Sequence, residues 1–215
     1  NSTFITYNGE DAVIRNAVEQ FNFNNNTVRG AGILVEHGTP NSVVSVQRNG
    51  VVPDLPVWEA FKVVRNNEPN AQVLFNNNTV TSTKTGALVA GSRNVNISQN
   101  TFNAQVSTAT GTFNHIKLDT KWWNGSTYPT NVSPVEEVST QARIVGNTFN
   151  SLAARQGSAV WLRNQFDNPT VMSPGIDAIQ VTGNTFTANV DSFIVLDTLT
   201  SQLTNINPTG AAVLA

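Results

Sequence analysis

Three charged residues in the C-terminal half of the chain each end a short segment in which apolar residues recur. The segments are His115–Asp119, Ala159–Arg163 and Phe193–Asp197. Alternation with a period of two predicts β-strands that bury one face. If these strands stack side by side, Asp119, Arg163 and Asp197 form one outward column, with Lys117 and Trp161 in the column beside it. Carboxylates, cations and an aromatic ring on one surface indicate polysaccharide binding or cleavage.

The two carboxylates of this column are candidates for glycoside hydrolysis. Asp119 and Asp197 would lie two strands apart, roughly 9–10 Å, which is at the edge of the range for an inverting mechanism. Arg163 between them would lower the pKa of both carboxyls, which disfavours a general acid. A lyase would instead use Lys117 or Arg163 as the base, and that requires a lowered pKa. Asp119, Asp197 and Lys117 are therefore catalytic candidates that no motif supports.

Two long insertions follow the same strands and should lie next to each other. They span residues 121–138, after Asp119, and residues 164–176, after Arg163. The first contains Trp122, Trp123 and Tyr128. Binding residues are common on loops that a rigid scaffold holds, and aromatic faces stack on sugar rings. The predicted binding site comprises Trp122, Trp123, Tyr128, Trp161, Arg163, Asp119 and His115.

Each of these residues also has an ordinary structural interpretation. The column of Asp119, Arg163 and Asp197 can be a surface ladder of ion pairs. Trp122 and Trp123 can seal their loop against the strands. His115 lies one step from the charged column, and a histidine at such a place is commonly an unremarkable strand residue. The functional interpretation depends on charges, tryptophans and long loops converging on one surface.

A repeated eight-residue pattern shows how these strands are positioned. It reads apolar, any, apolar, any, any, Asn, usually Thr, apolar, and the first copy is Phe21 to Val28. Its six anchor asparagines are Asn26, Asn49, Asn78, Asn100, Asn147 and Asn184. The two leading apolar residues share one face of a strand, and the last lies beyond a corner. Asn suits the corner because it tolerates the left-handed backbone region and bonds nearby backbone with its side chain.

The spacing of the anchors predicts stacked coils. Asn26 and Asn49 are 23 residues apart, and Asn78 and Asn100 are 22 apart. The longer interval from Asn100 to Asn147 contains one further alternating strand, so we interpret it as one coil with a long insertion. A fixed period of this length marks a stacked-repeat architecture.

The segment from Gly86 to Phe102, with its Asn100-Thr-Phe ending, resembles the parallel β-helix repeat family, the pectate-lyase-like superfamily. The resemblance covers residues 20–200 and implies an all-β fold. It predicts a single right-handed parallel β-helix of about seven coils of about 22 residues. The family includes lyases, hydrolases, epimerases, tailspikes and adhesins, so the fold leaves the activity open. The signatures of polygalacturonase-like members and the calcium-binding acidic cluster of pectate lyases are absent.

Composition limits the environment and the partners. Charged residues make up 12% of the chain and its net charge is −2, which argues against nucleic acid as a partner. The chain has no cysteine, which excludes thiolate metal sites and Cys nucleophiles. No stretch approaches 18 consecutive apolar residues, so no membrane span is expected. The surface is rich in Asn, Thr and Ser, which favours a protein that is secreted or lies on a cell or virion surface.

The whole chain, residues 1–215, is interpreted as a single domain with distinct ends. Residues 1–20 are a candidate N-terminal cap, because the segment from Asp11 to Gln20 permits a short helix with Asp11 as its N-cap, although it permits a strand equally. Residues 56–64 allow the same two interpretations. Residues 203–215 lose the repeat and end in an apolar tail. The Ser/Thr-rich start at Asn1 is typical of a cleaved or excised piece.

The sequence therefore predicts an extracellular β-helix that interacts with a polysaccharide or surface glycan, and that binds no cofactor and no metal. Cleavage, by a lyase or a glycoside hydrolase, stays open. The alternative is a structural protein, such as an adhesin rod, a tailspike shaft or a filament subunit. It would associate with copies of itself through the open coil ends or the apolar tail, because unpaired strand edges must be capped or paired.

Overall fold

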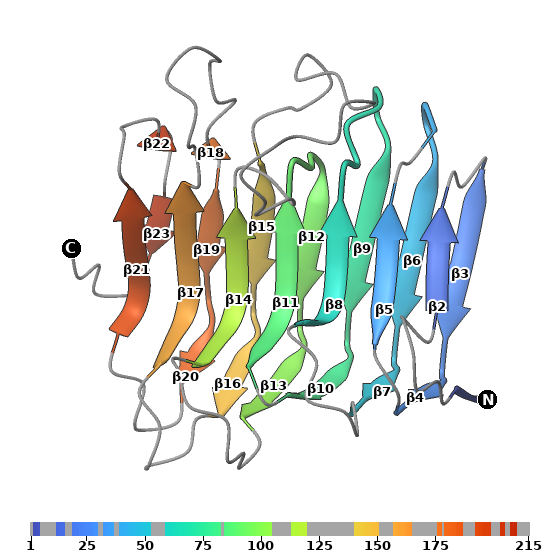
Figure 1. Cartoon of the computed structure of the whole chain (residues 1–215), viewed down its shortest axis with the longest axis horizontal. Coiled ribbons are helices and arrows are strands. Elements are labelled where there is room, and N and C mark those ends of the chain that lie inside the picture. The colour runs from blue at the N-terminus through green and yellow to red at the C-terminus, as the bar shows by residue number, and fades with distance from the viewer. Residues whose placement is uncertain are drawn as a thin grey trace, which may run out of the picture.

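The computed structural model shows the chain as a stack of coils, each made of three short strands (Figure 1). The described residues are 2–4, 12–15, 19–29, 32–36, 39–52, 59–82, 84–104, 113–119, 140–150, 157–164, 176–177, 179–186, 192–198, 203–204 and 207–209. Within them every regular element is a strand. The predicted all-β, parallel β-helix solenoid is thus confirmed.

Three parallel sheets, each of seven strands, run along the stack. Sheet A contains β1 (Thr3–Phe4), β4 (Thr27–Val28), β7 (Gly50–Val51), β10 (Thr79–Ser82), β13 (Thr101–Ala104), β16 (Thr148–Asn150) and β20 (Thr185–Phe186). Sheet B contains β2 (Ala12–Arg15), β5 (Ile33–Glu36), β8 (Glu59–Val64), β11 (Thr85–Ala90), β14 (Phe113–Asp119), β17 (Gly157–Asn164) and β21 (Ser192–Thr198). Sheet C contains β3 (Gln20–Asn24), β6 (Val43–Gln47), β9 (Gln72–Asn76), β12 (Val95–Ser98), β15 (Ala142–Val145), β19 (Gln180–Thr182) and β23 (Asn207–Thr209). A two-stranded pair joins β18 (Ile176–Asp177) to β22 (Leu203–Thr204).

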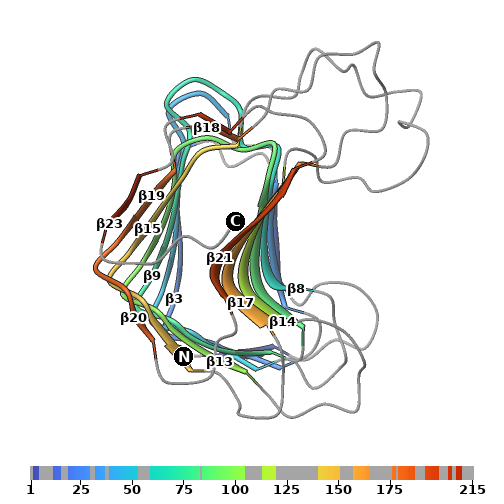
Figure 2. The same cartoon turned by 90° about the vertical axis from the view of Figure 1, so that its left-hand side faces the viewer.

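The core fills the space between the three sheets. Seen along the stack, sheets B and C face each other and sheet A closes the lower side (Figure 2). The inward residues of successive coils are Cα partners, so like side chains stack on like. Phe102 stacks on its partner Phe149 with ring centroids 5.4 Å apart, and Phe61 of sheet B stacks across the core on Phe75 of sheet C at 3.9 Å. This apolar column is what the alternation in each repeat encodes, because burying these rings stabilises the stack.

The six anchor asparagines form one hydrogen-bonded ladder at the corner between sheets C and A. From Asn49 onward, the Oδ1 atom of each anchor accepts the backbone N–H of the anchor one coil earlier, at 2.8–3.0 Å. From Asn49 onward, the Nδ2 atom of each anchor also donates to a strand carbonyl of the coil before. The predicted position of the anchors at a corner is confirmed. Their hydrogen bonds join successive coils.

The left-handed residue at this corner is not the anchor itself, as the sequence had suggested, but the residue before it. The residues with positive φ there are Asn25, Arg48, Asn77, Gln99, Gly146 and Gly183. The side-chain amide of the anchor is therefore free to bond groups of the neighbouring coils. The sequence-based assignment failed because a corner needs both a residue that bends and a residue that bonds, and Asn can do either.

The two segments with helical potential contain strands instead. Residues 12–15 form β2, which pairs with β5, and residues 59–64 form β8. Ala12 and Ile14 are Cα partners of the inward Ile33 and Val35, so sheet pairing overrides the local helical pattern. The remainder of residues 1–20 is described only at residues 2–4 and 19–20.

The long interval between Asn100 and Asn147 is one coil, as predicted. Strand β12 pairs directly with β15, and β13 pairs with β16. At the far end, β23 pairs with β19 and adds a strand to sheet C, so residues 207–209 continue the stack beyond the last repeat in the sequence.

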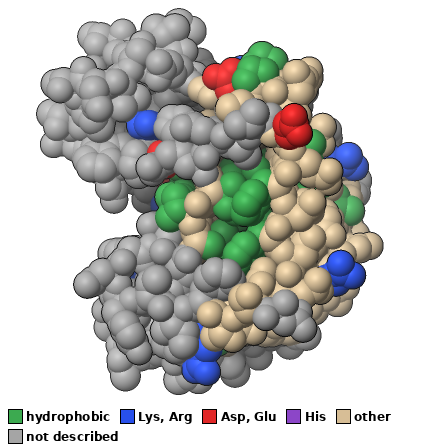
Figure 3. Space-filling model, turned by 90° about the vertical axis from the view of Figure 1, so that its right-hand side faces the viewer, with side chains coloured by type: hydrophobic (Ala, Val, Ile, Leu, Met, Phe, Trp, Pro, Cys, Tyr) green, Lys and Arg blue, Asp and Glu red, His purple; other side chains and the backbone are tan. Residues whose placement is uncertain are grey.

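Two large apolar side chains near the N-terminal end of the described stack are exposed. Phe21 is the Cα partner of the inward Val44, yet it is 42% exposed, whereas Val44 is 1% exposed. Val13, on the outer face of β2, is 50% exposed. Figure 3 shows hydrophobic side chains on this N-terminal end of the stack.

Candidate functional site

The strand register of sheet B agrees with the two columns that the sequence predicted. Asp119 is the Cα partner of Ala90 on one side and of Arg163 on the other, and Arg163 is the partner of Asp197. In the neighbouring column, Leu88, Lys117, Trp161 and Val195 are successive partners. On the inner face of the same sheet, Val35 is the Cα partner of Val63.

Lys117 contacts one residue of each column, Asp119 and Trp161. Its Nζ atom lies 3.4 Å from Oδ2 of Asp119 and 5.4 Å from the centroid of the Trp161 ring. Asp119 is 1% exposed, and its backbone carbonyl accepts a hydrogen bond from the hydroxyl of Thr140. The side chain of Lys117 is 13% exposed and Trp161 is partly buried. The ammonium group is thus held between a carboxylate and an aromatic ring, both attractive partners for a cation.

The other predicted site residues are only partly located. The backbones of Arg163 and Asp197 lie in β17 and β21, in register with Asp119, while their side chains lie outside the description. Trp122, Trp123 and Tyr128 lie outside the described residues, as do all of residues 121–138 and, of residues 164–176, all but Asn164 and Ile176. On this surface, the described side chains of the predicted residues are therefore those of Lys117, Asp119 and Trp161.

His115 lies inside the coil and is removed from this surface. It is fully buried, with its ring 6.4 Å from that of Phe102 and 5.3 Å from that of Phe149. Alternation would have placed it outward together with Lys117. At this corner, however, two successive residues are buried in the core, as Ala60 and Phe61 are in β8 and Ala159 and Val160 are in β17. His115 occupies the first of these positions, which Ala60, Gly86 and Ala159 fill in neighbouring coils.

Burial makes His115 a source of acid sensitivity. Loss of hydration lowers the pKa of His115 from 6.5 to about 3, so the folded protein keeps the imidazole neutral. Below about pH 6.5 the unfolded chain takes up a proton that the folded chain does not, so stability falls as pH falls from 6.5 towards 3. We expect this residue to lower the free energy of unfolding by about 2 kcal/mol between pH 7.5 and pH 5.

The His115→Leu variant tests this contribution, because leucine does not titrate and is of similar volume. Chemical denaturation of both proteins between pH 5 and pH 7.5 should show the variant losing about 2 kcal/mol less than the wild type as the pH falls. Parallel pH profiles for the two proteins would contradict the effect of His115.

The outer face of sheet B carries an apolar patch next to Lys117 and Asp119. Val64, Leu88 and Ala90 form a second buried cluster outside the coil core, with Leu34 packed against it. The polar side chains Lys117 and Asp119 begin one coil after Leu88 and Ala90. Glu36 and Lys62 occupy the same two columns on β5 and β8, whereas Lys117, Asp119 and the Trp161 ring come together on β14 and β17.

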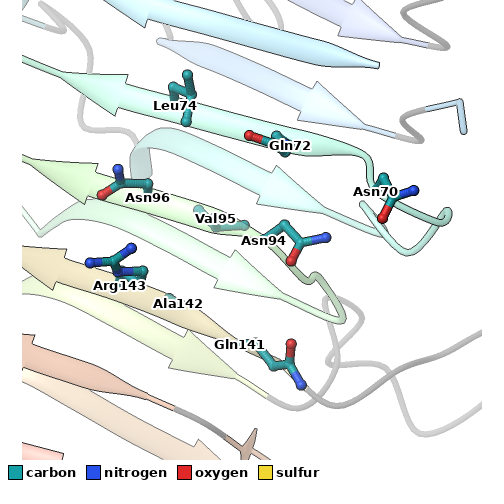
Figure 4. A pocket seen from close by; sticks show the side chains of 9 residues that line it. All are labelled: Asn70, Gln72, Leu74, Asn94, Val95, Asn96, Gln141, Ala142 and Arg143. Atoms are coloured by element: carbon teal, nitrogen blue, oxygen red, sulfur yellow. The ribbon is translucent and has the colours of Figure 1, made fainter. Parts of the chain in front are cut away.

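A hollow lies on the outer face of sheet C, where the sequence predicted no site. It has a volume of about 410 Å³ and crosses β9, β12 and β15 (Figure 4). Its lining is Asn70, Gln72, Leu74, Asn94, Val95, Asn96, Gln141, Ala142 and Arg143. The signal in the sequence was amide residues at the outward positions of consecutive repeats. It was hidden because Asn is common throughout the chain.

Neither a metal centre nor a membrane helix is found within the described parts of the chain. Those residues contain no group of three or more His, Cys, Asp or Glu side chains that could hold a metal ion. They also contain no helix of the length and hydrophobicity needed to cross a membrane. Comparisons with protein-family models, with curated proteins and with solved structures give no match.

Proposed function

We propose that the protein binds a polysaccharide or surface glycan on the outer face of sheet B, at β14 and β17. The arrangement of Lys117 between Asp119 and the Trp161 ring is the observation that carries this proposal. An indole ring offers a flat apolar face for the C–H side of a sugar, and an ammonium group donates to hydroxyl or carboxylate oxygens. Both groups stand on paired strands of one sheet, so little ordering is needed when the ligand binds.

The proposal is binding without cleavage. Asp119 is buried and paired with Lys117, so its carboxylate holds the ammonium group in place and does not face a ligand. A general acid must reach the leaving oxygen of the substrate directly or through one water molecule. In this proposal Asp119 is a positioning residue, and Trp161 and Lys117 contact the sugar.

The Trp161→Ala variant should lose glycan binding. We expect wild-type protein to bind a subset of an array of polysaccharides and oligosaccharides, and the variant to bind at least one of these at least about tenfold more weakly, because central aromatic residues dominate binding energy. Affinity is measured by titration calorimetry. Trp161→Phe is the matched control, since it retains an aromatic face, and it should bind within a few-fold of wild type.

Two results would contradict the proposal. One is an array on which wild-type protein binds no glycan. The other is a Trp161→Ala variant that binds every one of these glycans as tightly as wild type.

A further inference from the structure

The hollow on sheet C lies on the opposite side of the coil from the proposed glycan site. Figure 2 shows sheets B and C on opposite sides of the core. Its floor is set by register: Leu74, Asn96 and Arg143 are successive Cα partners on β9, β12 and β15. The next column of the hollow contains Gln72, Asn94 and Gln141, and Asn70 reaches it from the corner before β9. The two surfaces share no residue.

Most side chains that line the hollow are amides. Asn70, Gln72, Asn94, Asn96 and Gln141 each offer an amide, Arg143 offers a guanidinium, and Leu74 offers an apolar side chain. No carboxylate lines the hollow. An amide has both donors and an acceptor, whereas a guanidinium only donates. Such a lining suits a ligand whose polar atoms can both donate and accept.

One atom of the lining requires a donor from outside the described structure. Oδ1 of Asn96 is buried and has no hydrogen-bond partner. Buried side-chain oxygens in folded proteins are nearly always hydrogen-bonded, so each unpaired one needs an explanation. Because Asn96 faces the hollow, a bound ligand that donates a hydrogen bond would satisfy this oxygen (Figure 4).

Arg143, one coil away from Asn96, supplies hydrogen-bond donors that need an acceptor. Arg143 is the Cα partner of Asn96 and is exposed. Its Nε atom donates to Oε1 of Gln180 at 2.9 Å, which fixes the plane of the guanidinium. The hollow therefore presents an acceptor at Asn96 beside donors at Arg143. A cation is disfavoured by the guanidinium, and an anion is disfavoured by the unpaired oxygen of Asn96.

We propose that this hollow is a binding site for a neutral sugar unit. One hydroxyl donates to Oδ1 of Asn96, a neighbouring hydroxyl accepts from the guanidinium of Arg143, and the side chain of Leu74 packs against the carbon face of the ring. Vicinal hydroxyls meet both requirements, because each can donate and accept. Adjacent coils are about 4.8 Å apart, so the column of polar side chains runs along the stack in the direction an extended oligosaccharide could follow. This site does not depend on the one proposed on sheet B.

The test combines one substitution in the hollow with a matched one outside it. Asn96→Leu removes the unpaired oxygen at similar volume. Asn22→Leu makes the same change in the same outward column, since Asn22, Ser45 and Leu74 are successive partners, but on the first coil and outside the hollow. The probes are an array of neutral hexose and pentose oligosaccharides, followed by titration calorimetry with the best of them, and inorganic phosphate as an anionic probe.

We expect wild-type protein and Asn22→Leu to bind the same neutral oligosaccharide with equal affinity. Asn96→Leu should bind it at least about tenfold more weakly and should unfold at a temperature no lower than wild type, because leucine replaces an unsatisfied oxygen. Arg143→Met should also bind more weakly. Trp161→Ala should retain this binding, which separates the hollow on sheet C from the site on sheet B.

Three results would overturn the proposal. The first is wild-type protein that binds no neutral oligosaccharide. The second is binding that survives Asn96→Leu, whether or not Trp161→Ala abolishes it. The third is binding of inorganic phosphate that depends on Arg143 while neutral sugars do not bind, because this would make the hollow an anion site.

Discussion

Replacing Asn100 by Ala should lower the free energy of unfolding by about 4 kcal/mol and the melting temperature by about 10 °C. Asn100 is 1% exposed. Its Oδ1 atom accepts from the backbone N–H and from the Nδ2 atom of Asn78, at 2.8 and 3.0 Å. Its Nδ2 atom donates to the carbonyl of Phe75 and to Oδ1 of Asn147, at 2.8 and 3.0 Å. Alanine removes all four bonds and leaves buried groups of three residues short of a partner.

Asn26→Ala is the matched control, because it makes the same change in the same ladder. Asn26 lies at the N-terminal end and is only partly buried, and its Oδ1 atom accepts from the backbone N–H of Ser2 at 3.2 Å. We expect a loss of about 1 kcal/mol or less. Differential scanning calorimetry and urea denaturation measure both variants. Equal losses at Asn100 and Asn26 would show that the ladder does not stabilise the stack through its buried bonds.

The columns of the sheets could be predicted because a β-helix turns a sequence period into spatial register. Once the strands ending at Asp119, Arg163 and Asp197 were aligned by their alternation, their places beside one another followed, and the pairing of β14, β17 and β21 agrees. This alignment required only the alternation of apolar residues that recurs from strand to strand. Such periodic information is strong even where each single strand is short.

Features of the corners could not be predicted from a period of two. The corner before sheet B bends the chain so that His115 and Ile116 both point inward, which is why a residue expected beside Lys117 lies among phenylalanines. Similarly, Gly146 and Gly183 before two of the anchors were the signal for the left-handed residue, and they were obscured where Asn25 or Asn77 fills that position.

The hollow on sheet C escaped prediction for a different reason. Its existence depends on how the lengths of outward side chains differ between coils and on how Asn70 projects from its corner. Register alone places Leu74, Asn96 and Arg143 in a column, but it does not show that Oδ1 of Asn96 is buried without a partner. That property emerges only when the packing of neighbouring side chains is known.

Gly32→Ala should be among the most damaging single-atom additions to this chain, with an expected loss of about 4 kcal/mol. Gly32 has φ of +100°, in the region that L-residues rarely adopt. A Cβ atom there would also overlap the backbone carbonyl oxygen of Ala60 in the next coil. Because that oxygen belongs to the backbone of a paired strand, it can move away only if the spacing between coils changes.

Three other glycines separate the two causes. Gly86 has only the steric one: its Cβ would lie 2.6 Å from the carbonyl oxygen of His115 and 2.7 Å from the ring of Phe102. Gly91 has only the conformational one, with φ of +52° and open space around it, and Gly50 has neither. We expect alanine to cost about 3 kcal/mol at Gly86 and about 1 kcal/mol at Gly91, and to change stability by less than about 0.5 kcal/mol at Gly50.

Urea denaturation of the four alanine variants measures these losses under one condition. The expected order of destabilisation is Gly32, Gly86, Gly91 and then Gly50, with the first two well separated from the last two. If Gly91→Ala were as damaging as Gly32→Ala, backbone conformation alone would account for the loss. If Gly86→Ala were as stable as Gly50→Ala, the close approach of β11 to β14 at His115 would be wrong. The order therefore tests whether contact between successive coils or local backbone conformation limits substitution in this stack.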